Sequence, residues 1–213
     1  MNYNILKNLL SILTIVFFTS CQEKTNTEKN IQIDSSIIQK DSILKEETFA
    51  GKPISFYLNH PGIPQAAKDM YNGKVNPNLV EAAFVLPDSL DSQMKDTGPF
   101  YFIAVTRSFP KSDGAYSEGL GFWAKEYVEL NTIQFLKYFI EEPLLTESDF
   151  DFWSRSVGWE ISISFEKKEM QGFKEFELAL KSNCKKCTEV QEEKLTAFLK
   201  RVKGHIKKSI NNN

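Results

Sequence analysis

The chain has 213 residues, of which 41% are hydrophobic, 25% are charged and 13% are aromatic. This length suits one domain or two small ones, and the aromatic content excludes a chain that is disordered throughout. The 26 basic and 28 acidic residues give a net charge of −2, and only three of the basic residues are arginine. These values exclude a strongly basic nucleic-acid-binding protein. Two histidines are too few for a multi-histidine metal centre, so we expect neither a metal nor a dissociable cofactor.

The most specific pattern in the sequence lies at the N-terminus. Lys7 supplies a positive charge, residues 9–18 (LLSILTIVFF) form an apolar core, and Cys21 follows two small residues. A helix that spans a bilayer needs about 20 apolar residues, so this stretch is too short to span stably. Its length, its charge and the order of its parts are typical of a secretory signal peptide.

Residues 18–21, with the sequence FTSC, resemble the lipobox of bacterial lipoproteins. The resemblance implies that residues 1–20 are a signal peptide cleaved before Cys21. It also implies that Cys21 carries a thioether-linked diacylglycerol and an amide-linked acyl chain, which together anchor a protein far more stably than one chain. Gln22 at the next position implies an outer-membrane location, on either the periplasmic or the surface face. An ordinary cleaved signal peptide and an uncleaved anchor are the alternatives.

Residues 21–48 are expected to form a flexible tether between this anchor and a folded domain. From residue 22 onward the segment contains no aromatic residue, glycine or proline, and its charges alternate in sign. Such a composition is typical of a spacer, although its scattered isoleucines also fit a short helix or an edge strand that docks on the domain. Without residues 1–20 the chain has 25 basic and 28 acidic residues and a net charge of −3. We therefore expect the lipid, rather than electrostatic attraction, to hold the protein on the membrane.

Residues 49–213 are expected to form a single domain with an α+β fold. Alternating apolar and polar residues predict strands at 52–58 and 157–165, and residues 99–108 are apolar on both faces, as in a central strand. Residues 79–86 fit either a helix or a strand. Helical spacing, with capping boxes that begin at Thr146 and Thr188, predicts helices at 64–73, 117–129, 131–142, 146–153, 167–182 and 188–210. The predicted architecture is a small, mostly antiparallel sheet with helices packed largely on one face and a helical hairpin at the C-terminus.

Two cysteines, Cys184 and Cys187, lie in the turn between the last two predicted helices. Because a cysteine pair in an exported protein is normally oxidised, we expect a structural disulfide, which closes a very short loop and stabilises the fold little. Thiol–disulfide exchange is the alternative, since two flanking lysines and a helix N-terminus favour the thiolate. However, a thioredoxin-like motif follows a strand, whereas this pair follows a helix, and a single CxxC supplies only half a zinc site.

The remaining candidates for chemistry are weaker. His60 precedes Pro61 and Gly62 and is interpreted as a turn residue, because the sequence offers no serine or cysteine elbow for it to activate. The acidic residues within 141–151 are interpreted as a solvated helix junction rather than as catalytic carboxylates or a calcium loop. The aromatic residues nearby are expected to belong to the core, with a possible ligand surface formed by Phe150, Trp153 and Trp159.

These patterns predict a membrane-anchored envelope lipoprotein with a binding or structural role, no catalysis, and an envelope protein or a glycan as partner. Two alternatives remain open. One is a periplasmic thiol–disulfide oxidoreductase that uses Cys184 and Cys187, which requires exposed cysteines with an oxidising potential. The other is a substrate-binding lipoprotein for the uptake of a glycan or peptide, which requires a concave surface with exposed aromatic residues.

Overall fold

The part of the chain that the structure describes, in a computed structural model, comprises residues 46–79, 90 and 96–212. The predicted signal peptide, Cys21, the tether up to residue 45 and the ambiguous residues 80–86 lie outside the described residues. All described residues belong to one unit, Leu44–Asn213.

Eight α-helices make up most of this described part, and the predicted α+β fold is wrong. The helices are α1 (Ile54–Asn59), α2 (Gln65–Tyr71), α4 (Gly98–Ser108), α5 (Gly114–Leu130), α6 (Thr132–Glu141), α7 (Glu147–Ser164), α8 (Glu169–Asn183) and α9 (Glu189–Asn212). Within the described ranges, the only sheet is an antiparallel hairpin of two-residue strands, β1 (Thr48–Phe49) and β2 (Lys52–Pro53). The helices therefore pack on one another, as in a bundle, rather than on a sheet.

The predicted central strand at 99–108 is the helix α4. Seven consecutive residues, from Phe100 to Thr106, are buried. A segment that is apolar on all sides fits a helix surrounded by other helices as well as it fits a strand covered on both faces, because periodicity alone does not separate the two. The neighbouring helices decide between them, since α4 packs against both α2 and α7.

The predicted strand at 157–165 is the second half of α7. The helix begins at the predicted capping box, in which Thr146 Oγ1 accepts a hydrogen bond from Asp149 N and Asp149 Oδ2 accepts one from Thr146 N. From there the apolar residues buried by α7 follow helical spacing: Phe150, Trp153, Val157 and Ile161. The alternation also included Trp159 and Ile163, and these side chains are 54% and 64% exposed. Thus two of the five alternating apolar residues do not enter the core.

The predicted strand at 52–58 ends after β2, where α1 begins. Ile54 and Tyr57 are buried three residues apart, on one face of a helix. Ala50 and Gly51, which join the two strands, both have positive φ angles (51° and 75°), as a two-residue type I′ turn requires. The backbone oxygen of Glu47, a residue of the predicted tether, accepts a hydrogen bond from Ile54 N at 2.9 Å.

Aromatic rings from α4, α6, α7 and α9 pack on one another within the core. The ring of Phe102 in α4 stacks on Trp153 in α7, with centroids 4.9 Å apart and planes 14° from parallel. Phe135 in α6 packs edge-on against Trp153 at 5.4 Å and against Phe198 in α9 at 4.9 Å. Trp153 Nε1 donates a hydrogen bond to Thr106 Oγ1 at 2.9 Å, so the polar atom of the buried indole has a partner.

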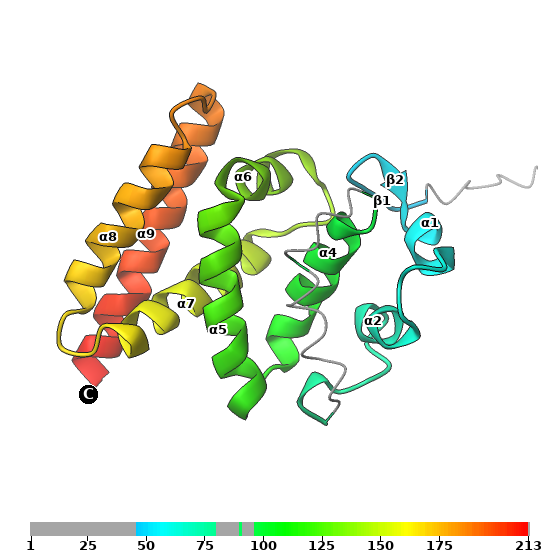
Figure 1. The fold of residues 1–213 in the computed structure, drawn as a ribbon, viewed down its shortest axis with the longest axis horizontal. Coiled ribbons are helices and arrows are strands. Elements are labelled where there is room, and N and C mark those ends of the chain that lie inside the picture. The colour runs from blue at the N-terminus through cyan, green and yellow to red at the C-terminus, as the bar shows by residue number, and fades with distance from the viewer. Residues whose placement is uncertain (1–45, 80–89, 91–95, 213) are drawn as a thin grey trace, which may run out of the picture. The chain divides into compact units, whose positions relative to one another are not determined.

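Helix α7 lies at the centre of the C-terminal helices and contacts α5, α8 and α9 (Figure 1). Its crossing with α9 is close at Gly158, where an added Cβ would stand 3.2 Å from the backbone oxygen of Val202.

Helices α8 and α9 run side by side in opposite directions (Figure 1). The predicted cap of α9 is confirmed, because Thr188 N donates to Gln191 Oε1 at 2.9 Å. None of the helices in the described ranges has the length and hydropathy of a membrane span.

Candidate functional site

A groove with a volume of about 580 Å³ runs between α5 and α7 and is called the α5–α7 groove below. Its lining includes Phe109, Asp113, Glu118, Gly121, Phe152, Arg155, Trp159, Glu160 and Ile163. A concave surface that combines aromatic and charged side chains is the form that small-ligand and peptide sites take.

The floor of the groove is set by the close approach of the two helices at Gly121. A Cβ added at Gly121 would stand 3.3 Å from the backbone oxygen of Ser156 and 3.4 Å from Glu160 Cβ. A larger residue here would hold α5 and α7 apart. The glycine therefore brings side chains of both helices to the rims of one narrow groove.

Aromatic and aliphatic side chains form the apolar part of the lining. The rings of Phe109 and Phe152 are nearly parallel, with centroids 6.4 Å apart and 2° between their planes. The Arg155 guanidinium lies 4.7 Å from the Phe152 ring centroid, in a cation–π contact. Trp159 and Ile163 complete this part of the lining, and both expose more than half of their surface to solvent.

The charged residues of the groove are three carboxylates and one guanidinium. Asp113, Glu118 and Glu160 face the groove together with Arg155. None of the four forms an ion pair with another described residue. Glu160 Oε1 accepts a hydrogen bond from Ser164 Oγ at 2.5 Å. The lining thus carries net negative charge that is available to a ligand.

The three aromatic residues predicted as a possible ligand surface do not lie together. Phe150 and Trp153 are 1% and 0% exposed and belong to the core, so neither reaches a ligand. Trp159 is exposed and lines the α5–α7 groove. Burial separates them because Phe150 and Trp153 lie on the α7 face whose rings contact Phe135 of α6, whereas Trp159 lies on another face of the helix.

Cys184 and Cys187 lie at disulfide distance in the turn between α8 and α9, with their Cα atoms 4.9 Å apart. Cys184 is buried, and Cys187 is half-buried and packs against the core. A thiolate that takes part in exchange needs access to its partner, which the burial of Cys184 restricts. The flanking Lys185 and Lys186 are exposed.

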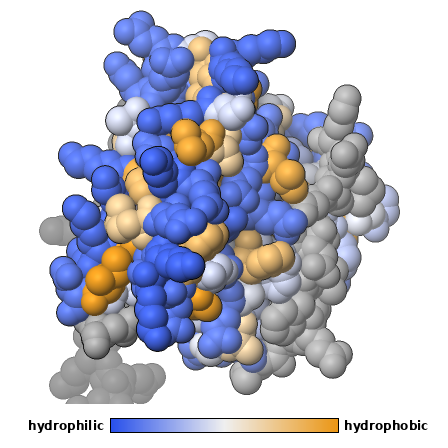
Figure 2. Space-filling view, turned by 60° about the vertical axis from the view of Figure 1, so that its left-hand side comes forward, coloured by the Kyte–Doolittle hydropathy of each residue, from blue (hydrophilic) through white to orange (hydrophobic). Residues whose placement is uncertain are grey.

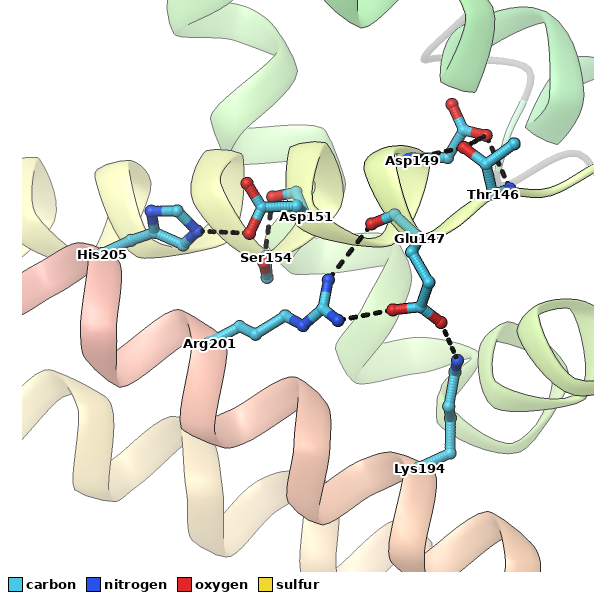
Figure 3. A network of polar contacts seen from close by, with 8 residues as sticks. All are labelled: Thr146, Glu147, Asp149, Asp151, Ser154, Lys194, Arg201 and His205. Carbon is cyan, nitrogen blue, oxygen red and sulfur yellow. Dashed lines mark hydrogen bonds and ion pairs between the residues drawn. The ribbon is translucent and has the colours of Figure 1, made fainter.

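The acidic residues at the start of α7 form a network with cations of α9 (Figure 3). Glu147 accepts a hydrogen bond from Lys194 Nζ at 3.1 Å, and Arg201 donates both to its carboxylate and to its backbone oxygen. The hydrogen bond from Lys194, followed by the charges of both cations, lowers the pKa of the Glu147 carboxyl below its usual value. Asp151 Oδ1 lies 3.0 Å from His205 Nε2. These contacts join two helices, which supports a structural role for the acidic run.

Neither histidine points into the α5–α7 groove. His60 Nδ1 accepts a hydrogen bond from Gly62 N at 3.0 Å, as expected for a turn residue, and His205 faces Asp151. The described ranges contain no group of three His, Cys, Asp or Glu side chains with metal-binding geometry.

Sequence reasoning named only Trp159 among the groove residues and missed Asp113, Glu118, Arg155 and Glu160. These residues meet only because α5 crosses α7 at Gly121, and no local pattern encodes that crossing. One signal was present in the sequence. Once 147–164 is treated as one helix, its buried stripe is complete without Trp159 and Ile163, so this i, i+4 pair is left on the surface.

Comparison with known proteins adds no relative: no protein-family model, no curated protein and no solved structure matches the chain.

Proposed function

We propose that this chain is a lipid-anchored envelope lipoprotein, attached through Cys21, whose helical domain binds a glycan or a peptide in the α5–α7 groove without catalysis. The observation that carries the proposal is the position of Trp159. A large aromatic side chain that is 54% exposed stands in a groove of about 580 Å³.

The groove offers a ligand both apolar surface and orientation. Covering an exposed indole releases about 25 cal/mol for each Å² of apolar surface removed from water. Aromatic faces also stack on sugar rings and on peptide side chains. The carboxylates of Glu118 and Glu160 and the guanidinium of Arg155 supply acceptors and donors at fixed places around that surface.

A binding role agrees better with the other candidate groups than a catalytic one does. His60 holds a turn, His205 contacts Asp151, and Cys184 is buried. We therefore propose that the Cys184–Cys187 pair is a structural disulfide. A redox titration read by alkylation and mass is expected to give a potential below about −300 mV. A potential near −200 mV, with one thiol that reacts rapidly at neutral pH, would favour the oxidoreductase alternative.

The proposed binding site is tested by replacing Trp159. Tryptophan fluorescence of the wild-type chain is titrated with soluble oligosaccharides and with short peptides, and any ligand found is measured again by calorimetry. Trp159→Ala is expected to weaken the binding of that ligand at least tenfold, as for a central aromatic contact. Phe122→Ala is the matched control, because Phe122 is 55% exposed on α5 and does not line the groove.

Two outcomes would contradict the proposal. Equal losses in Trp159→Ala and Phe122→Ala would remove the groove as the site, and no binding to any compound of either class would remove the function. The anchor is tested separately. Metabolic labelling with palmitate is expected to label the wild-type chain and to leave Cys21→Ser unlabelled.

A further inference from the structure

The cations near the C-terminus form two sets that differ in their partners. After Glu193 the sequence carries six lysines and arginines and no acidic residue. Lys194 and Arg201 face α7, where both pair with the carboxylate of Glu147 (Figure 3). Four other lysines of α9 form no ion pair with any described residue: Lys200, Lys203, Lys207 and Lys208. The first set holds the fold together, and the second set has no such structural role.

Three of these lysines, Lys200, Lys203 and Lys207, lie along one face of α9, because their spacing of three and four residues is that of successive helical turns. Two shallow hollows of about 240 and 460 Å³ follow the seam between this face and α8, and Lys203 lines both of them. Met170 of α8 and Ile210 of α9 line the second hollow. We call the group Lys200, Lys203, Lys207, Met170 and Ile210 the α8–α9 lysine surface.

Acidic groups do not cancel the charge of this surface. Glu177 is the one acidic residue in the lining of the smaller hollow, and it pairs with Lys181 at 2.7 Å, whereas the larger hollow has no acidic residue in its lining. That pair is neutral as a whole, so the α8–α9 lysine surface keeps three positive charges. The chain as a whole is nevertheless slightly acidic, with a net charge of −2. Folding therefore gathers a local positive charge that the composition does not show.

Apolar side chains accompany these charges. Met170 and Ile210 are 38% and 40% exposed, and Lys203 Nζ lies 5.6 Å from the ring centroid of Phe173. Lysine stems cover apolar surface in this way while their ammonium groups remain in water. Figure 2 shows the side of the domain that carries α8 and α9, where hydrophobic residues lie singly among hydrophilic ones.

We propose that the α8–α9 lysine surface docks onto an anionic lipid bilayer. The three ammonium groups meet lipid phosphates, and Met170 and Ile210 enter the boundary between headgroups and acyl chains. This combination fits a bilayer better than it fits a soluble polyanion, because a soluble polyanion has no apolar layer to receive Met170 and Ile210. The docking is independent of the α5–α7 groove, and an acyl anchor on Cys21 would strengthen it by holding the surface close to the membrane.

The test uses the full chain with Cys21→Ser, so that lipid attachment contributes nothing. Its partition onto phosphatidylcholine vesicles is compared with that onto vesicles containing about 30% phosphatidylglycerol. Lys203→Gln/Lys207→Gln removes two charges from the surface. Lys185→Gln/Lys186→Gln removes the same charge from exposed residues at the other end of α8, about 20 Å away for a helix of 15 residues. Circular dichroism verifies that each variant is folded.

On the anionic vesicles, Lys203→Gln/Lys207→Gln is expected to lower the partition coefficient about 25-fold, or about fivefold for each lysine. The Lys185→Gln/Lys186→Gln control is expected to stay within about twofold of the parent chain, and added salt is expected to weaken the parent chain's binding. A third variant, Met170→Ser/Ile210→Ser, is expected to weaken vesicle binding and to leave binding to soluble heparin unchanged.

Three results would overturn the inference. Equal partition onto neutral and anionic vesicles would exclude headgroup charge as its basis. Equal losses in the two lysine variants would exclude this surface as the docking site. Unchanged vesicle binding in Met170→Ser/Ile210→Ser, together with tighter binding to heparin than to vesicles, would identify a soluble polyanion as the partner.

Discussion

The buried hydrogen bond between Trp153 and Thr106 provides a sharp test of how the core is held together. The Thr106 hydroxyl is fully buried, accepts the indole N–H at 2.9 Å and donates to the backbone oxygen of Phe102 at 2.8 Å. Thr106→Val keeps nearly the same shape but removes the acceptor. The indole N–H is then buried without a partner, because Trp153 is also fully buried.

The expected cost follows from that orphaned donor. Leaving a buried N–H unsatisfied costs about 1–3 kcal/mol, whereas the hydroxyl bond to a carbonyl one helical turn back contributes little net free energy. We therefore expect Thr106→Val to lower the free energy of unfolding by about 2 kcal/mol. Thr106→Ser keeps the acceptor, loses one methyl group and is expected to cost about 1 kcal/mol.

A double-mutant cycle with Trp153→Phe isolates this hydrogen bond. In the Trp153→Phe background no indole N–H remains to be orphaned, so Thr106→Val is expected to cost less than it does in the wild type. Urea unfolding of the four chains is expected to give a coupling free energy of about 1–2 kcal/mol. If the costs of Thr106→Val and Trp153→Phe sum to within about 0.5 kcal/mol of the cost of the double variant, the hydrogen bond does not stabilise the core and the reasoning is refuted.

Three further predictions concern the C-terminal helices. Because the folded-state pKa of Glu147 is lowered, its ion pairs stabilise the fold at neutral pH and lose that effect as the pH falls through the lowered pKa. Glu147→Gln should therefore lower the free energy of unfolding in urea by at most about 1 kcal/mol at pH 7, and the difference from the wild type should shrink as the pH is lowered through that pKa. Gly158→Ala places a Cβ 3.2 Å from a backbone oxygen of α9 and should lower the melting temperature. Gly204→Ala should raise the melting temperature, because no atom lies within 4 Å of the added Cβ and alanine favours a helix over glycine by about 1 kcal/mol. Replacing both Cys184 and Cys187 by alanine should lower the free energy of unfolding in urea by about 2 kcal/mol or less, because the proposed disulfide closes a very short loop. A loss above about 4 kcal/mol would contradict this account.

Local signals in the sequence predicted most of the helices correctly. The apolar spacing at 131–142 and the capping residues Thr146 and Thr188 are each found at the expected helix. Such signals act over one or two helical turns, and their effect does not depend on what packs against the helix. They are therefore visible without the tertiary structure.

The errors occurred where a pattern had two solutions. Residues 99–108 are apolar on every face, and only the surrounding helices decide that they form α4 and not a strand. Residues 157–165 alternate strictly, yet the helix that begins at Thr146 continues through them. Val157 and Ile161 then face the core, and Trp159 and Ile163 are left outside. A correct prediction required weighing the cap and the helical spacing above the alternation.

The sequence by itself determined the local structure: the helix caps, the spacing of the buried residues and the pattern that resembles a lipobox at Cys21. Only the tertiary structure decided which surfaces exist. The α5–α7 groove depends on the crossing at Gly121, and the α8–α9 lysine surface depends on α9 turning one set of cations toward Glu147 and the other toward solvent. Both arise from contacts between segments that are distant in the chain. The physical reason is that a local pattern fixes the conformation of one helix, whereas a binding surface is fixed by how two helices cross.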